Sequence, residues 1–286
     1  MRHSSRTLLI VAALLTTVVA AFASALVAVA AVRSTELSSS ARLSGRAAQG
    51  GQGVTITPWL HASLQIEGDG FVVQVDPWGA ADLSRAKPAD IVLVTDDSAH
   101  HLDLTAIARV RKPGAPVILP PVAKGRLDTG TVLPNGASVS VRALRVESIA
   151  AYDLTPGAPA HPQGEASGYL VTIGGQRILV AGVTECVPEV KALRNIDVAI
   201  MPMNIPPARM SPAAAAACVK ALAPKAVYVY HYDQGHAAQI EKRQPSAGWL
   251  APGTTVPGSL QAFKAALAGT SIDVRLPDWY AAQTAR

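Results

Sequence analysis

The chain has 286 residues, and 49% of them are apolar, which is enough for a sizeable core and excludes a globally disordered protein. The formal net charge is +5, but most of the positive excess lies before residue 50, where there are five arginines and one glutamate. The rest of the chain is therefore nearly neutral. The sequence has no run of Lys and Arg with interleaved aromatic residues, and we therefore expect no nucleic-acid partner.

Residues 1–33 carry the pattern of an export signal. Arg2 and Arg6 precede an uncharged run, rich in Ala, Val and Leu, from residue 7 to residue 32. This run is longer than the ~7–15 residues of a signal-peptide core and matches the ~17–25 that span a bilayer, so residues 1–33 are either a cleaved signal peptide or a retained membrane anchor. Positive charge at the start keeps that end in the cytoplasm. We expect an extracytoplasmic body, secreted, periplasmic or membrane-anchored through residues 7–32, after a flexible linker at residues 34–52.

Short apolar runs separated by turns predict strands in the first half of the body, which extends over residues 53–280. The turn at residues 67–70 is rich in Gly and Asp, as hairpin turns are. Asp103 has the position of an N-cap, directly before a helical segment. The expected strands are residues 54–59, 62–66, 71–75, 91–94, 117–119 and 139–146, and the expected helix is 104–110.

The second half alternates strands and helices more regularly. A Gly-Gly turn joins two hairpin strands, and Ser211-Pro212 marks the start of a helix. The expected strands are residues 169–173, 177–181, 198–201, 226–230 and 272–276, and the expected helices are 188–193, 213–222 and 260–267. Hairpins and β-α units in both halves predict a single α/β (α+β) domain, in which mixed sheets stack on each other with helices outside.

Acids and imidazoles gather where the buried strands end, and both are metal ligands. These residues are Asp96, Asp97, His100 and His101 after the strand at 91–94, His161 in the loop at 151–167, and His231 directly after the strand at 226–230. A single histidine is more often a packing residue, so the hypothesis depends on the coincidence of four. Because strand ends at one edge of a sheet converge, we expect the four histidines to approach a common point, with Asp96 at its rim.

With these motifs the chain resembles the metallo-β-lactamase fold superfamily, and in particular its lactonase-like branch, which includes ascorbate-6-phosphate lactonase. The likeness covers roughly residues 53–280. It rests on Asp76-Pro77, the Val-Thr strand before residues 96–101, the Gly-Tyr strand after His161, and residues 182–185, 195–199 and 229–232. The resemblance implies an αββα sandwich and a metal-dependent hydrolase.

The metal-binding motif of that superfamily is altered in this chain. It reads His-x-His-x-Asp-His, followed by a distant His, a bridging Asp and a final His. His101, His161 and His231 keep the family ligand. The other four positions are changed: Asp96 and Ser98 stand for the first two histidines, His100 for the motif Asp, and Val183 for the bridging Asp.

The loss of the bridging carboxylate favours one metal over two, because carboxylates offset the repulsion between neighbouring cations. We expect one zinc ion, held by some of Asp96, His100, His101, His161 and His231, since zinc suits a mostly imidazole set with one carboxylate. The resemblance implies hydrolysis of a small ester, lactone or phosphodiester by a metal-bound water, which Asp96 or His100 would orient. The alternative is a catalytically inactive binding protein with the same fold, which the changes at Ser98 and Val183 favour.

Five further residues have expected roles around this site. We expect Asp76 and Asp97 to form hydrogen bonds with the metal ligands and so to orient them. For Asp97, a role as a loop cap is an equal alternative. We expect His61 to be a packing residue, since a His at this position is not a ligand in the family. Cys186 and Cys218 are expected as buried small hydrophobic residues, with a disulfide as the alternative outside the cytoplasm.

Overall fold

The described part of the computed structural model comprises residues 53–157, 160–244 and 248–276. The described residues all belong to one compact unit. The predicted signal or anchor and the linker at residues 34–52 lie outside them. In the part that the structure describes, no helix has the length and apolar character needed to cross a membrane.

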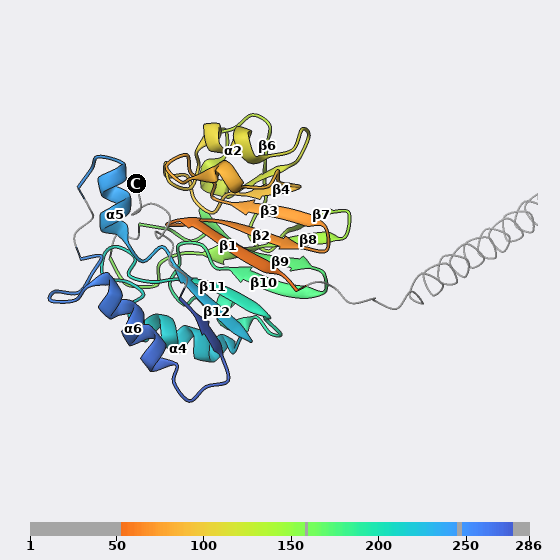
Figure 1. Ribbon diagram of the computed structural model, residues 1–286. Helices are drawn as coiled ribbons and strands as arrows, with labels where there is room; N and C mark the ends of the chain where they lie inside the picture. The colour runs from red at the N-terminus through yellow and green to blue at the C-terminus, as the bar shows by residue number, and fades with distance from the viewer. Residues whose placement is uncertain (1–52, 158–159, 245–247, 277–286) are drawn as a thin grey trace, which may run out of the picture. The chain divides into compact units, whose positions relative to one another are not determined.

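Six strands form the first sheet (Figure 1). They are β1 (Thr55–Leu60), β2 (Ser63–Gly68), β3 (Phe71–Val75), β4 (Ile91–Leu93), β5 (Val117–Leu119) and β6 (Gly130–Val132), in this spatial order. The first three form an antiparallel meander, and β3 to β6 are parallel. The β2–β3 turn uses Asp69 and Gly70 at positive φ, as its sequence predicted.

Seven strands form the second sheet, in the order β13-β12-β11-β10-β9-β8-β7. They are β7 (Ser138–Val141), β8 (Leu144–Ala151), β9 (Ala166–Ile173), β10 (Gln176–Val180), β11 (Val198–Pro202), β12 (Ala226–Tyr230) and β13 (Asp273–Arg275). Strands β7 to β10 are antiparallel and β10 to β13 are parallel. The single strand expected at residues 139–146 is in fact a hairpin, because Arg142 turns the chain at a φ of +54°.

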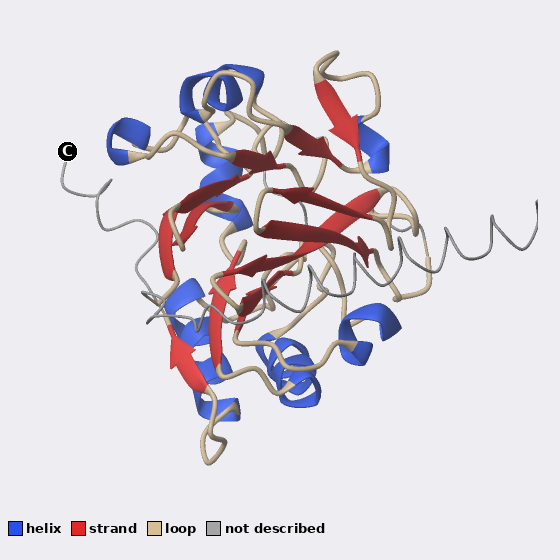
Figure 2. Ribbon diagram, turned by 90° about the vertical axis from the view of Figure 1, so that its right-hand side faces the viewer, coloured by secondary structure: helices blue, strands red, loops and turns tan. Residues whose placement is uncertain are grey.

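Helices cover the outer faces of both sheets (Figures 1 and 2). They are α2 (Leu104–Val110), α3 (Pro188–Ala192), α4 (Pro212–Leu222), α5 (Gln234–Ile240) and α6 (Val256–Ala266), with the short 3-10 turns η1 (Leu83–Arg85) and η2 (Pro121–Ala123). Asp103 caps α2 and Ser211 caps α4, as predicted. Helix α5 was not predicted, because its Gly-containing segment shows no apolar period.

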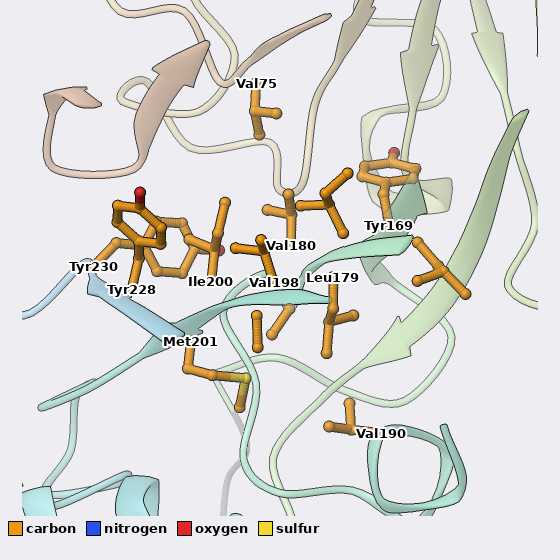
Figure 3. Packing of buried hydrophobic residues seen from close by; sticks show 14 of the residues in the cluster. Val75, Tyr169, Leu179, Val180, Val190, Val198, Ile200, Met201, Tyr228 and Tyr230 are labelled. Carbon is orange, nitrogen blue, oxygen red and sulfur yellow. The ribbon is translucent and has the colours of Figure 1, made fainter. Parts of the chain in front are cut away.

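The main core lies between the two sheets. Successive side chains of a strand point to opposite faces, so Val180 faces the first sheet and Val75, whereas Leu179 faces Val190 of α3 (Figure 3). The outer face of the first sheet packs against α2, through Val92 and Ile107 among others. This layering of helix, sheet, sheet and helix confirms the predicted αββα sandwich.

Cys186 and Cys218 form a disulfide, so the expectation of two unpaired hydrophobic residues is wrong. Cys186 precedes α3 and Cys218 lies within α4. The packing of these segments brings the two Cα atoms to 5.6 Å, within the range that a disulfide spans. A distance between elements 32 residues apart is set by tertiary packing, which the local sequence does not report.

Candidate metal centre

Asp76 fixes the loop that carries the altered motif. It follows β3 in a left-handed conformation and is fully buried. Its carboxylate accepts hydrogen bonds from the main-chain N–H (2.7 Å) and the hydroxyl (2.6 Å) of Thr95, just beyond β4. The same carboxylate lies 2.8 Å from Nδ1 of His101. The first imidazole of the site is therefore held by the neighbouring strand end.

Four buried imidazoles meet where the two sheets approach each other. They belong to His61, His100, His101 and His231. The ring centroids of His61 and His231 are 4.0 Å apart, and those of His100 and His101 are 4.6 Å apart. The Nε2 atoms of His101 and His231 are separated by 3.2 Å. His61, His100 and His231 each offer a nitrogen within 4.8 Å of the other two, which makes them a potential metal site.

Each of the four imidazoles has its Nδ1 atom held from behind at 2.8 Å. The pairs are His61 with Asp233, His100 with Glu241, His101 with Asp76, and His231 with the side-chain amide of Gln234. In metalloproteins, an outer carboxylate that accepts from Nδ1 fixes the tautomer and the ring orientation of a ligating histidine. For His231 the same role requires the amide oxygen of Gln234, not its nitrogen, to face Nδ1, which is a flip of the side-chain amide. The arrangement leaves the Nε2 atoms on the inside of the cluster.

Helix α5 provides three of these four outer partners. Asp233 is its N-cap residue, Gln234 is its first residue, and Glu241 is its C-cap residue. None of the three was identified from the sequence as part of a site. The signal that was available is the short spacing between His231 and the polar pair Asp233-Gln234.

The electrostatics keep two of the imidazoles neutral near pH 7. Burial, together with the neighbouring His101, lowers the pKa of His100 to about 3. Burial raises the pKa of Glu241, but the hydrogen bonds and charges of His100 and Arg243 together outweigh burial and lower that pKa to about 2. Burial and the nearby His61 also hold the pKa of His231 well below its ordinary value. A neutral imidazole has the lone pair that a metal requires.

His101 behaves differently from its neighbours. Burial lowers its pKa, but the charge and hydrogen bond of Asp76 outweigh burial, so the pKa of His101 lies above its ordinary value. The cluster therefore contains one imidazole that tends to be protonated and lies 3.2 Å from a neutral one. A metal ion would replace that proton, because coordination releases protons from the ligands it binds.

Two of the predicted ligands, Asp96 and His161, form a pair beside the cluster. Nε2 of His161 lies 3.9 Å from Asp96, and Nδ1 lies 3.6 Å from Asp153. Asp153 also pairs with buried Arg209 at 3.1 Å. The five predicted ligands thus divide into three that join His61 in the cluster and two at its side. His161 is near enough to contribute to the lowered pKa of His231.

The remaining predicted residues lie as follows. Val183, at the expected position of the bridging Asp, is buried and belongs to the hydrophobic core between the sheets. Asp97 points to the surface, where it forms an ion pair with Arg126 at 3.1 Å, so it does not back a ligand. His61 differs most from expectation: it is not simple packing but part of the imidazole cluster.

A cavity of about 350 Å³ opens beside this region. It is lined by residues of the β11–α4 loop, including Asn204 and Arg209, and by Trp249 and residues near the start of α6. Trp249 packs on α5, since a Cβ atom added at Gly235 would lie 2.8 Å from its indole ring. The cavity is thereby connected to His161 through Arg209 and Asp153, and to the cluster through α5.

The chain matches the family described as "Beta-lactamase superfamily domain" over residues 55–231, which include all four clustered histidines. It belongs to the metallo-β-lactamase superfamily. It is 27% identical to the UPF0173 metal-dependent hydrolase of Pyrobaculum arsenaticum over 190 residues, or 60% of this chain and 81% of that protein. The superfamily resemblance inferred from the sequence motifs is therefore confirmed.

Two solved structures of superfamily proteins resemble this one. A protein of Parabacteroides distasonis, named as a metal-dependent hydrolase, shares 33% identity and a TM-score of 0.64, over 78% of this chain and 92% of that one. The metallo hydrolase Igni18 of Ignicoccus hospitalis has a TM-score of 0.58 at 19% identity, over 79% of this chain and 95% of that one. The second likeness concerns the fold alone.

Proposed function

We propose that this protein is a metal-dependent hydrolase whose metal ion is held in the imidazole cluster, with His100, His101 and His231 as ligands. One observation carries the proposal: Nε2 of His101 lies 3.2 Å from Nε2 of His231, and His100 offers a nitrogen within 4.8 Å of one of His231. The carboxylates of Asp76 and Glu241 hold the Nδ1 atoms of His101 and His100. Such a donor set fits a divalent cation of the zinc type, which favours nitrogen ligands. The metal-dependent hydrolases among the relatives support the same activity.

A cation bound there would lower the pKa of a coordinated water toward ~7 and polarise the substrate oxygen. The protein's own residues have separate tasks. The carboxylates behind His100 and His101 keep the rings in place, and the buried surroundings exclude bulk water. Burial raises the pKa of Asp96, but the charges of His101 and His161 outweigh it and leave Asp96 ionised. Asp96 is thus placed to orient an attacking water at the rim.

We propose one metal ion per chain. A second ion would need a carboxylate between the two cations, and the side chain at that position is the buried Val183. Asp96 and His161 alone offer two ligands, fewer than the three protein ligands of a catalytic zinc site.

We propose an uncharged ester or lactone as the substrate, in keeping with the lactonase-like branch, rather than a phosphodiester. Arg209 is the buried cation of this region, and it is already neutralised by Asp153 at 3.1 Å and Glu185 at 3.6 Å. It is therefore a poor anchor for a phosphate. The cavity beside it is flanked by the indole ring of Trp249, which suits an apolar acyl or aryl group.

We also propose that the protein acts outside the cytoplasm, released or held by residues 7–32. The basic, apolar N-terminal pattern motivates this, and the Cys186–Cys218 disulfide supports it, because disulfides persist mainly in oxidising compartments.

The test of the proposed activity combines metal analysis with turnover. The purified protein is loaded with zinc, freed of excess metal, and assayed by elemental analysis and against aryl esters, lactones and phosphodiesters. We expect one zinc per chain and turnover of esters or lactones. A protein that retains no metal and turns over nothing in this panel is instead an inactive binding protein with the superfamily fold.

A further inference from the structure

We infer that His61 is itself a metal ligand and completes a mononuclear centre of four nitrogens, compensating for the carboxylate lost at Val183. The inference deepens the proposed function and rests on it. It assigns a ligand to the turn between β1 and β2, a segment in which the sequence motifs of the superfamily place none.

The first reason is that one ring nitrogen of His61 lacks a hydrogen-bond partner among the described residues. The residue is 1% exposed, and its Nε2 atom is buried with no hydrogen-bond partner among the described residues. Burying a polar nitrogen without a partner is unfavourable, and native proteins seldom leave one so. A metal ion at the centre of the cluster would satisfy this atom.

The orientation of the ring is the second reason. Asp233 lies 2.8 Å from Nδ1 of His61, so Nε2 is the atom directed away from this carboxylate. The ring centroid lies 4.0 Å from that of His231 and 5.0 Å from that of His100. Each of these three residues has a ring nitrogen that lies within 4.8 Å of a ring nitrogen of the other two.

The spacing of the other ligands fits four-coordinate zinc. Two nitrogens at ~2.0–2.1 Å from one tetrahedral ion are about 3.3 Å apart. The Nε2 atoms of His101 and His231 are 3.2 Å apart. The rings of His61 and His100 lie beside this pair, with the centroid of His61 4.0 Å from that of His231 and the centroid of His100 4.6 Å from that of His101.

The backbone conformation at His61 places its side chain next to that of His231. His61 and His231 both have positive φ, +56° and +55°, which is uncommon for residues other than glycine. Strain of this kind gathers at functional sites. The main-chain N–H of His231 donates to the carbonyl of His61 at 3.2 Å, which fixes the two residues side by side.

The charges of the surrounding carboxylates are consistent with one bound divalent cation. Three carboxylates lie behind the four imidazoles, namely Asp76, Asp233 and Glu241. They replace, at a distance, the negative charge that the bridging Asp would contribute directly. With four nitrogens on the ion, the reacting water would enter as a fifth ligand, and Asp96 and His161 are left to contact that water or the substrate.

The experiment measures metal affinity and coordination in His61→Asn, because Asn accepts positive φ and is too short to replace the imidazole. His236→Ala, which removes an exposed histidine of α5, is the control. The probes are Zn²⁺ in competition with a chelator and Co²⁺ absorption. We expect wild-type protein and control to bind one ion, with the intense Co²⁺ bands of a four-coordinate site. We expect His61→Asn to lose more affinity than the roughly 10–100-fold caused by removing an outer partner, with a changed Co²⁺ spectrum.

A second variant guards against simple misfolding. His61→Gly suits the backbone conformation and leaves a space that free imidazole can enter. We expect added imidazole to restore Co²⁺ binding in this variant and to leave the control unchanged. If wild-type protein binds one ion and His61→Asn binds it equally well with the same spectrum, the inference fails while the proposed function stands. Two ions per wild-type chain would overturn the mononuclear centre, and none would overturn both proposals.

Discussion

The main-chain N–H of His231 donates a hydrogen bond to the carbonyl oxygen of His61, with a nitrogen–oxygen distance of 3.2 Å. This bond joins the β1–β2 turn of the first sheet to the end of β12 in the second. The two imidazoles on either side of it have centroids 4.0 Å apart. The proposed metal site therefore draws its residues from both layers of the sandwich and requires them to be correctly stacked.

His231→Ala should abolish both metal retention and hydrolysis. His231 is 3% exposed, and its Nε2 atom lies 3.2 Å from that of His101. Its removal would take one ligand from a site that has only three or four. Zinc per chain and ester turnover are the measurements, with His236→Ala as the matched control. Full zinc content in His231→Ala would contradict the placement of the ion.

The double variant Val183→Asp with Ser98→His should raise metal content toward two per chain. The first change restores a carboxylate between two ions, and the second adds an imidazole next to Asp96 and His161. Val183→Asp alone should lower stability, because it buries a carboxylate in the core between the sheets. Elemental analysis and thermal melting distinguish the two. An unchanged metal content in a folded double variant would show that more than these two residues excludes the second ion.

Removing the disulfide by Cys186→Ala and Cys218→Ala should destabilise the domain by about 2–4 kcal/mol, because the closed loop restricts the unfolded chain. Urea unfolding gives the free energy of unfolding. Zinc affinity is expected to remain, since neither cysteine contacts the imidazoles. Wild-type stability in a strong reductant serves as the comparison and should match the double variant.

Asp90→Asn should destabilise the protein by about 1 kcal/mol near pH 7 and less in acid. Burial raises the pKa of Asp90, but hydrogen bonds from Lys112 (2.8 Å) and the main-chain N–H of Val72 (3.0 Å), together with the charges of Lys112 and Arg142, outweigh burial and hold the pKa below its ordinary value. A lowered carboxyl pKa stabilises the fold above the unfolded value and loses its effect as pH falls through the folded value. Urea unfolding at pH 7 and pH 3 tests this, and a constant difference would refute it.

Export is tested with a reporter that is active only outside the cytoplasm, fused after Arg286. Arg2, Arg6 and the uncharged run to residue 32 should carry the fusion across the membrane. Arg2→Glu with Arg6→Glu is the matched control and should reduce export. A silent reporter on an intact, expressed wild-type fusion would rule out the extracytoplasmic location.

The fold was predictable because its signals are local. Hairpin turns, the N-caps Asp103 and Ser211 and the apolar strand at residues 91–94 each report their own structure. Three of the four clustered histidines were predictable for the same reason, since they follow buried strands. His61 was not, because its role depends on a long-range meeting with Asp233 and His231. For the same reason the sequence offered the disulfide only as an alternative, because its two cysteines lie in different elements.

Helix α5 touches three of the four imidazoles through its ends, whereas the fourth, His101, is secured by Asp76 at the end of β3. The ring orientations of His61, His100 and His231 are thus not independent of one another. Any displacement of α5 would shift all three at once and leave His101 behind. Trp249 packs on this helix at Gly235 and also lines the neighbouring cavity. A molecule that fills the cavity would therefore contact Trp249 and could displace α5, and with it the three imidazoles that α5 orients.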